Sequence, residues 1–316
     1  MATIAKFPLF VAEKAYSFAT PGFAEDKLAV LAHQLRAMNP TMGLVFYYNA
    51  NLDLTDYRLY NKSAVHAPNW WVRNSSGTVL IAPIDAGPGN VPPFPYNAHG
   101  GGVPIYDFTV PGMVDAWVQE CFDATSPSGG FTGCMVDRWT RTPFKKTMPG
   151  FTPEMIAAFT AGRDNATSQL AARAKAEGLY LVGEGASVNA ISDPGYGQGG
   201  PNSLRNQLGY AAQGLGMLAS YRPRSVGAAF TTQLAKFLVG AAEGHYFGAG
   251  SWTVNATERE GVTWHPEYDM PLGAPLGNAT RTGTLYTRRF AYGTSVRYDT
   301  ASDTGNISWG SFPPTD

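Results

Sequence analysis

The stretch Leu44-Val-Phe-Tyr-Tyr-Asn49 is a continuous apolar run that ends on a polar side chain. A run of this kind is typical of a strand that is buried on both faces, as in a parallel sheet. Residues 7–11 form a similar run, and a helical pattern lies between the two. Its apolar stripe comprises Leu28, Leu31, Leu35 and Met38. The Asn39-Pro40 pair ends this helix, because the residue before a proline is pushed out of the α region. The order strand, helix, strand predicts a parallel βαβ unit.

The same alternation continues along the chain. Short apolar runs at 103–106, 133–136 and 179–182 predict further strands. One helical pattern follows Pro111, and another follows Thr152-Pro153-Glu154, which combines a cap, a proline at the first helical position and an acidic first turn. Residues 202–243 are mostly helical in pattern, and a strand is expected near 215–221.

These patterns predict a single α/β domain over residues 1–316, folded as a (β/α)8 TIM barrel. Residues 285–298 alternate around Tyr292-Gly293, which predicts a short C-terminal β-hairpin. The hairpin belongs to a β-rich tail, 280–316, that we expect to pack on the barrel. No glycine-rich dinucleotide fingerprint or Walker loop follows an early strand, so a nucleotide-binding doubly wound fold is disfavoured.

Charge and composition exclude several classes of partner. Only 15% of the 316 residues are charged, and Lys+Arg 23 against Asp+Glu 24 leave a formal net charge of -1. Proteins that bind nucleic acid or anionic membranes carry basic patches, so we expect neither partner. The five histidines are scattered and the chain has two cysteines, so we expect no metal and no cofactor. The sequence does not indicate an oligomeric state.

Two features bear on the compartment in which the protein works. Cys121 and Cys134 lie in one predicted helix-to-strand unit, where they either pair or remain as two buried thiols. Asn-X-Ser/Thr triplets, which mark glycosylation acceptors or reflect polar loop composition, begin at Asn61, Asn74, Asn165, Asn255, Asn278 and Asn306. The apolar opening at 7–12 is too short for a membrane span and lacks a signal-peptide cleavage site. We interpret the chain as a secreted glycoprotein.

The active site of a (β/α)8 barrel lies at the carboxyl ends of its strands, so the residues that end or follow the predicted strands are candidates. They are Glu13 and Lys14, Tyr48 and Asn49, Asp107, Asp137 with Arg138 and Trp139, and Glu184. For Asp107 the simpler interpretation is a cap of the following helix, because Thr109 and Pro111 come directly after it.

Asp137 and Glu184 differ from Asp107. Asp137 ends the run Phe131-Thr-Gly-Cys-Met-Val-Asp137, and Arg138 could hold it ionised. Glu184 stands between two glycines, which permit close approach of a ligand. Glycoside hydrolysis needs such a pair, one carboxylic acid to protonate the leaving oxygen and one carboxylate to attack or to activate water. The alternative is that both carboxylates form salt bridges at the mouth of the barrel.

Aromatic side chains near strand ends and in long loops favour a sugar ligand, because flat rings stack on the apolar faces of pyranoses. They are Tyr47, Tyr48, Trp70, Trp71, Trp139 and Trp252. His245 follows Glu243-Gly244, where the end of a helix is the simpler interpretation and a role in the site the other.

Several motifs, in this order, resemble those of hypothetical glycosyl hydrolases related to the α-amylase-type TIM barrels. They are the run 44–49 after Asn39-Pro40, Pro68-Asn-Trp-Trp-Val-Arg73 with Gly77, the stretches 106–111 and 131–139, Trp264-His-Pro-Glu-Tyr-Asp269 with the segment to Gly277, and the stretch 286–293. The resemblance spans about residues 8–309. It implies a barrel in which Asp137, after the fourth strand, is the nucleophile and Glu184, after the fifth, is the acid/base.

The resulting hypothesis is a retaining glycosidase that acts on a polysaccharide or glycan, its carbohydrate substrate. The residues expected to bind substrate are Glu13, Tyr48, Asn49, Trp70, Trp71, Asp107, Arg138, Trp139, His245 and Trp252. Retention requires carboxyl groups about 5–5.5 Å apart, against ~6.5–9.5 Å for inversion. If the pair is too far apart, the replacements for Glu184 are Glu13, Asp85 and Asp107.

Two other functions remain open at this stage. One is a polysaccharide lyase acting on a uronic-acid polymer, with Tyr48, Lys14 or His245 as the base. The other is a non-catalytic carbohydrate-binding barrel.

Overall fold

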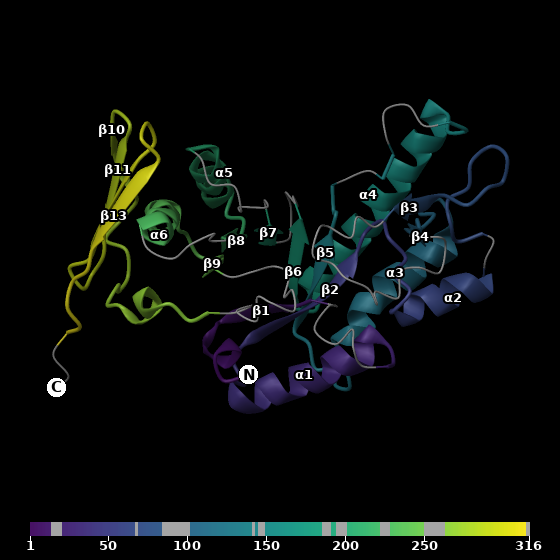
Figure 1. The fold of residues 1–316 in the computed structure, drawn as a ribbon, viewed down its shortest axis with the longest axis horizontal. Helices are drawn as coiled ribbons and strands as arrows, with labels where there is room; N and C mark the ends of the chain where they lie inside the picture. The colour runs from purple at the N-terminus through teal and green to yellow at the C-terminus, as the bar shows by residue number, and fades with distance from the viewer. Residues whose placement is uncertain are drawn as a thin grey trace. The chain divides into compact units, whose positions relative to one another are not determined.

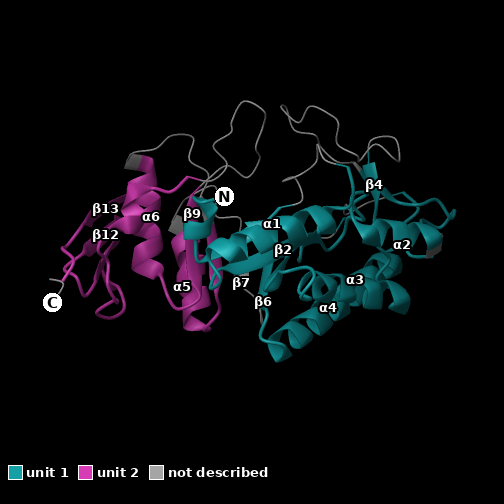
Figure 2. Ribbon diagram, turned by 90° about the horizontal axis from the view of Figure 1, so that it is seen from below, with its two compact units in different colours: residues 1–190 teal, residues 191–316 magenta. Residues whose placement is uncertain are grey.

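The structure is a computed structural model that describes residues 1–13, 21–66, 69–83, 102–140, 143–144, 149–184, 191–193, 201–221, 228–249 and 263–313. The chain divides into two compact units, Met1–Ala190 and Ile191–Asp316 (Figure 2). The single domain expected over 1–316 stays a prediction, and the two units are considered one after the other.

The core of the first unit is a parallel sheet (Figure 1). Its strands, in spatial order, are β1 (Leu9–Ala12), β2 (Gly43–Asn49), β5 (Gly133–Asp137) and β6 (Tyr180–Glu184). The helices that connect them are α1 (Ala24–Met38), α3 (Pro111–Ala124) and α4 (Pro153–Ala176), and α2 (Arg58–His66) and a 3-10 turn (Ile4–Lys6) complete the helical elements. This part of the chain confirms the βαβ prediction made from the run at 44–49.

The predicted ends of the helices follow local chemistry. α1 ends at Met38, and Asn39 is extended (φ -143, ψ 93) as expected before a proline. At the start of α4, Thr152 accepts a hydrogen bond from the N–H of Met155, and Pro153 occupies the first turn. The apolar stripe of α1 is buried at Leu28, Leu31 and Leu35, whereas Met38 is exposed.

The two faces of β2 have different surroundings, because successive side chains of a strand point to opposite faces. Tyr48 packs on Trp117 of α3, with 5.0 Å between the ring centroids. Trp117 also donates a hydrogen bond to the carbonyl of Asn49 at 3.0 Å. The helices of the first unit therefore cover the Phe46 and Tyr48 face, and the side chains of Tyr47 and Asn49 belong to the other face.

One predicted strand is not part of this parallel sheet. β4 (Gly102–Pro104) pairs antiparallel with β3 (Ile81–Pro83), and β2 pairs directly with β5. The prediction of a parallel strand at 103–106 is therefore wrong. Pro104 and Pro83 explain why, since a residue without an N–H is confined to edge positions of a sheet.

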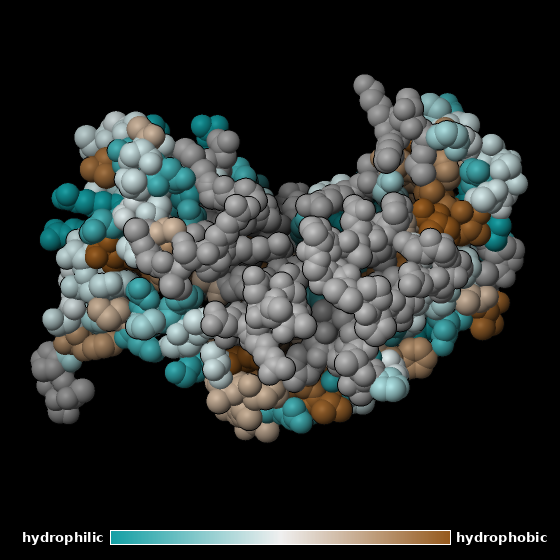
Figure 3. Space-filling model, viewed as in Figure 1, coloured by the Kyte–Doolittle hydropathy of each residue, from teal (hydrophilic) through white to brown (hydrophobic). Residues whose placement is uncertain are grey.

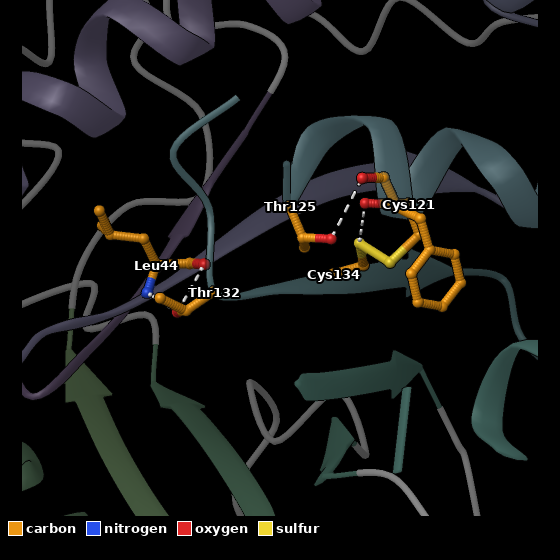
Figure 4. Close-up of a disulfide and its surroundings, with 6 residues drawn as sticks. Leu44, Cys121, Thr125, Thr132 and Cys134 are labelled. Atoms are coloured by element: carbon orange, nitrogen blue, oxygen red, sulfur yellow. Dashed lines mark hydrogen bonds between the residues drawn. A yellow bond between two sulfur atoms is a disulfide. The ribbon is translucent and has the colours of Figure 1, made fainter. Parts of the chain in front are cut away.

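Cys121 and Cys134 form a disulfide, with 5.9 Å between their Cα atoms (Figure 4). The bond joins α3 to β5, the strand that ends on Asp137. Just before β5, Thr132 accepts a hydrogen bond from the N–H of Leu44 at 2.7 Å, which adds a link between β2 and β5. Of the two states left open by the sequence, the structure has the paired one.

The disulfide should contribute measurably to stability. The cysteines are 13 residues apart, and a closed loop of this size restricts the unfolded chain by about 3 kcal/mol. We expect the double variant Cys121→Ser, Cys134→Ser to lose about that free energy of unfolding in urea titrations. Wild-type protein unfolded in a reductant should show a similar loss, and an unchanged midpoint in both would contradict the prediction.

The second unit also has parallel strands, β7 (Ile191–Asp193), β8 (Met217–Tyr221) and β9 (His245–Ala249), with helices α5 (Pro201–Ala212) and α6 (Ala228–Gly240). β8 occupies the place expected for a strand within the helical region 202–243. A 3-10 turn (Pro266–Asp269) leads to an antiparallel sheet of β10 (Thr280–Thr282), β11 (Leu285–Arg289), β12 (Ser295–Asp299) and β13 (Thr304–Ser308).

The antiparallel sheet packs on α6, as the yellow strands and the green helix of Figure 1 show. Its buried face includes Phe290, Val296 and Tyr298. Lys236 of α6 is fully buried and pairs with Asp303 at 3.1 Å. The predicted hairpin at 285–298 is confirmed as β11 and β12, within a sheet that is larger than the hairpin alone.

Among the described residues, the parallel strands form one run in each unit and do not close into an eight-stranded barrel. The α/β class is confirmed, and the closed barrel is not observed. None of the helices described is both long and apolar enough to span a membrane. Figure 3 shows apolar side chains among the described residues at the surface, as is ordinary for folded proteins.

Candidate active site

Three polar residues stand in one row at the carboxyl ends of neighbouring strands. Asn49 of β2 is the register partner of Asp137 of β5. On the other side, Val136 of β5 is the partner of Gly183 of β6, so the next position brings Asp137 beside Glu184. Neighbouring strands lie about 4.8 Å apart, and residues side by side point to the same face. The side chains of Asn49, Asp137 and Glu184 therefore project to the same face. We call these three residues the acidic row, after its two carboxylates.

Two side chains from β2 bind the carboxylate of Asp137. The Tyr47 hydroxyl donates to Oδ2 at 2.6 Å, and the Asn49 amide donates to the same oxygen at 2.9 Å. Tyr47 reaches Asp137 because it lies on the same face as Asn49, two residues earlier in the strand. Burial, followed by the charges of Asp137 and Glu13, raises the pKa of Tyr47 well above its ordinary value of 10. Tyr47 therefore remains a hydrogen-bond donor throughout the working range of pH.

Glu184 is held by the backbone that follows Asp137. Its Oε2 accepts a hydrogen bond from the N–H of Arg138 at 3.0 Å. Arg138 has a φ of 59°, in the left-handed region that residues other than glycine seldom adopt. Such strain is found preferentially at functional sites, where the surrounding structure enforces it. The strained residue is thus the one whose N–H binds the second carboxylate of the row.

A third acidic residue belongs to the same edge. Glu13 directly follows β1, whose last residue, Ala12, is paired with Phe46. One position further, Glu13 comes beside Tyr47, and its charge contributes to the raised pKa of Tyr47. Glu13 is half-buried. Of the residues predicted from strand ends, the structure thus brings Glu13, Asn49, Asp137, Arg138 and Glu184 together.

Tyr48 is not part of this group. It is 3% exposed and lies on the opposite face of β2, against Trp117. These contacts do not support Tyr48 as a substrate-binding residue or as the base of a lyase, and both roles stay predictions. Tyr47, its neighbour on the other face, was noted in the sequence as an aromatic near a strand end but not among the residues expected to bind substrate.

Asp107 serves the local turn. Its Oδ1 accepts hydrogen bonds from the N–H and the hydroxyl of Thr109, at 3.0 and 2.6 Å. This arrangement positions the chain before Pro111, where α3 begins. Asp107 also does not follow a parallel strand, since β4 is antiparallel to β3. Asp107 does not cap α3, because the N-cap position is Val110 and receives no side-chain hydrogen bond. Asp107 instead holds the turn before the helix, and its role in substrate binding stays a prediction.

The adjacent tryptophans have different surroundings. Trp71 is buried, stacks on Tyr60 at 5.8 Å and donates a hydrogen bond from Nε1 to Oδ2 of Asp53 at 2.7 Å. Trp70 is half-buried, and its carbonyl accepts from the N–H of Asp107 at 2.8 Å. These contacts place Trp71 in the core, and substrate binding by Trp70 and Trp71 stays a prediction.

Asp53, the partner of Trp71, makes stability depend on pH. Burial raises its pKa from 3.8 to about 7, and hydrogen bonds from Trp71, Ser63 and Tyr106 oppose the shift. Because the folded state binds this proton more tightly than the unfolded chain, Asp53 favours folding below about pH 4. That contribution, on the order of 4 kcal/mol for three pH units, is lost as the pH rises from about 4 through 7.

We expect Asp53→Asn to flatten this dependence of stability on pH, because an amide does not titrate in this range. The amide oxygen can still accept the hydrogen bond from Trp71. Urea unfolding at intervals from pH 4 to 8 measures the effect, with Asp115→Asn, on the exposed face of α3, as the control. A wild-type slope in Asp53→Asn would contradict the assignment.

His245 is the first residue of β9 and not the end of a helix. Its Nε2 lies 3.1 Å from the carbonyl of Leu215, and burial lowers its pKa. His245 stands at the amino end of its strand, whereas barrel sites use the carboxyl ends. This position supports neither substrate binding by His245 nor its use as a base.

Trp139 is 8% exposed and directly follows Arg138. Trp252, Lys14 and Asp85 lie outside the described residues.

In the parts of the chain that the structure describes, no cluster of three or more His, Cys, Asp or Glu side chains is arranged to hold a metal ion.

Comparisons with solved structures found chains of similar fold. The glycoside hydrolase domain of PelA from Pseudomonas aeruginosa is similar at 12% identity and a TM-score of 0.48, over 83% of this chain and 94% of that chain. The GH31 dextranase FjDex31A from Flavobacterium johnsoniae has 10% identity and a TM-score of 0.49, over 81% of this chain and 34% of that chain. The α-N-acetylgalactosaminidase NagBb from Bifidobacterium bifidum has 13% identity and a TM-score of 0.48, over 90% of this chain and 44% of that chain. No curated protein matches the sequence.

A family model gives a more direct match, to residues 217–294. This segment runs from β8 to the turn before β12 and does not include Asp137 or Glu184. The match supports glycoside hydrolase activity. Over residues 217–294, the chain matches Hypothetical glycosyl hydrolase family 15, which confirms the resemblance found in the sequence.

Proposed function

We propose that this protein is a retaining glycoside hydrolase that cleaves a polysaccharide or another glycan, with Asp137 as the nucleophile and Glu184 as the acid/base. The observation that carries this proposal is the register of the sheet, which sets Asp137 and Glu184 side by side at the ends of neighbouring strands. The spacing of about 4.8 Å between strands is compatible with the 5–5.5 Å between carboxyl groups that retaining enzymes use.

The two roles follow from the partners of each carboxyl group. Asp137 accepts two side-chain hydrogen bonds, which suits an ionised carboxylate that has acceptors only. Glu184 accepts a backbone N–H on Oε2, a bond that an acid can keep whether or not the other oxygen carries a proton. Asp137 is thus suited to attack and Glu184 to transfer a proton.

The reaction proceeds in two balanced steps. An oxygen of Asp137 attacks the anomeric carbon, the glycosidic C–O bond breaks, and the leaving oxygen takes the proton of Glu184. A water molecule then gives a proton to the Glu184 carboxylate while its oxygen attacks the same carbon, and the ester bond to Asp137 breaks. The glycan gains one water, and both carboxyl groups return to their initial states.

Further residues would bind the sugar. Glu13 and Arg138 contribute charged groups, and Trp70 and Trp139 contribute rings that can stack on it. We propose the same for Trp252. Asn49 binds Asp137 directly, so its effect on the substrate is exerted through that carboxylate. Asp137, Glu184 and Asn49 all lie at strand ends, as active-site residues of a (β/α)8 barrel do. The closed barrel is therefore part of the proposal.

We further propose that the protein works outside the cytosol. The Cys121–Cys134 bond supports this, because structural disulfides persist in oxidising compartments. Of the predicted glycosylation triplets, Asn61, Asn165, Asn278 and Asn306 have exposed side chains.

The experiment that tests the function is a product-release assay on a broad panel of polysaccharides, with mass spectrometry of the products. Hydrolysed products that gain one water, and that disappear with Asp137→Asn, support the proposal. Dehydrated products would identify a lyase instead. Retained glycan binding without turnover in either protein would identify a carbohydrate-binding protein.

A further inference from the structure

We infer that Tyr47 and Asn49 are positioning residues that bind Oδ2 of Asp137 and thereby select Oδ1 as the oxygen that attacks the sugar. The inference rests on the proposed function in that it takes Asp137 to be the nucleophile. The choice between the two oxygens of Asp137 rests on the contacts between β2 and β5.

The two oxygens of a free carboxylate are equivalent and exchange when the group rotates. In this protein both donors reach the same oxygen, at 2.6 Å from Tyr47 and 2.9 Å from Asn49. Oδ1 receives no hydrogen bond from the residues that the structure describes. Rotation of the carboxylate would break two charge-assisted hydrogen bonds, so the oxygens are no longer equivalent.

Each donor is itself fixed. The Asn49 side-chain oxygen accepts from the N–H groups of Asn51 and Leu52, both at 2.9 Å. These bonds determine which end of the amide faces Asp137, so its NH2 group must point to the carboxylate. Tyr47 is 2% exposed, and its ring cannot turn away without moving into the core. Both donors are therefore rigid before any substrate binds.

The backbone of Asp137 is anchored as well. Its carbonyl accepts from the N–H of Ala50 at 2.9 Å, which carries the pairing of β2 with β5 past the end of the strand. With backbone and Oδ2 both held, the remaining oxygen has a defined direction. Attack on the anomeric carbon forms the C1–Oδ1 bond as the glycosidic C–O bond breaks, and the leaving oxygen takes the proton of Glu184. Oδ2 keeps its two donors throughout.

Removal of one donor should affect the chemical step more than binding. Tyr47→Phe deletes the hydroxyl and keeps the ring, so Asp137 gains freedom to rotate. Because misplacement of a reacting group by about 1 Å costs roughly 10²-fold in rate, we expect kcat to fall by about 10–100-fold with KM changed by less than about threefold.

A matched control is available in the same unit. Tyr57 is as buried as Tyr47, and its hydroxyl donates to the carbonyl of Tyr47 at 2.7 Å without touching Asp137. Tyr57→Phe therefore removes a buried hydroxyl of the same kind and should keep the wild-type kcat. Equal losses in the two variants would show that the effect is structural and overturn the inference.

Asn49→Asp gives a second, independent variant. The remaining oxygen can still accept from Asn51 and Leu52, so the loop is preserved, but the donor becomes a carboxylate facing Oδ2. We expect a loss of kcat at least as large as in Tyr47→Phe, with partial recovery towards acid pH, where the introduced group is protonated and can donate. A pH profile of wild-type shape would contradict the assigned role of Asn49.

Crystal structures of the wild type and of Tyr47→Phe separate this inference from the proposed function, because they need no turnover. The inference requires Oδ2 to be held by both donors in the wild type and the carboxylate to rotate in the variant. If the wild type turns over no glycan, the proposed function fails, but the structures still show whether Tyr47 and Asn49 fix the orientation of the Asp137 carboxylate. If the wild type is active and the variant matches it in kcat and in the orientation of Asp137, the inference fails and the function stands.

Discussion

Asp137→Asn is expected to abolish turnover, with kcat/KM lower by at least about 10⁴-fold, the scale seen when a nucleophile is removed. The amide has the size of the carboxylate and can still accept a hydrogen bond from Tyr47, so the fold should persist. What it lacks is a negatively charged oxygen able to form an ester with the anomeric carbon. Initial rates on the polysaccharide identified by product release measure the loss.

The control for this variant is Asp115→Asn, on the exposed face of α3, which should retain the wild-type rate. Circular dichroism of both proteins checks that they are folded. Turnover by Asp137→Asn within tenfold of the wild type would remove Asp137 from the role of nucleophile.

Glu184→Gln has the second largest expected effect, a loss of about 10²–10⁴-fold on natural glycans, which is the usual contribution of a general acid. The glutamine can still accept the N–H of Arg138 but has no proton to give. The loss should therefore depend on the leaving group, being large for a sugar and small for a dinitrophenolate, which departs without protonation.

Comparison of an aryl glycoside series with the natural glycan tests this dependence. With the activated substrate, the second step should become slow, because no carboxylate remains to take the proton of water. Added azide, which needs no such help, should restore turnover and yield a glycosyl azide. A uniform loss across all leaving groups would assign Glu184 to a role other than acid/base, and Glu13 would become the next candidate.

The sequence alone could place the acidic row because each strand is a short apolar run that stops on a polar residue. Asn49, Asp137 and Glu184 were predicted at carboxyl ends, and the parallel pairing then aligns them. This step needs only the βαβ order, which the run at 44–49 and the helix stripe of α1 already indicate.

The choice between Tyr47 and Tyr48 could not be made in this way. In a strand buried on both faces, the polar alternation that distinguishes the faces is missing. Only the packing of Tyr48 on Trp117 shows which face belongs to α3, and that contact joins residues 69 positions apart. The hydrogen bond from Tyr47 to Asp137 depends on the same long-range arrangement.

The other departures have similar causes. β4 has the composition of a buried strand, but Pro104 confines it to an edge. His245 follows a glycine with a φ of 74°, which suits the end of a helix as well as the start of a strand. In each case the local pattern was compatible with two structures, and tertiary contacts determined which one formed.

The most direct test of the central claim is the mass of the peptide that contains Asp137. Glu184→Gln would be mixed with an activated aryl glycoside of the identified sugar, quenched in acid within the first turnover and digested. The account predicts that this peptide gains the mass of one glycosyl residue, attached to Asp137, and that the gain disappears after azide is added. An unmodified peptide under conditions in which the aryl group is released in a burst, or a glycosyl residue attached elsewhere, would contradict it.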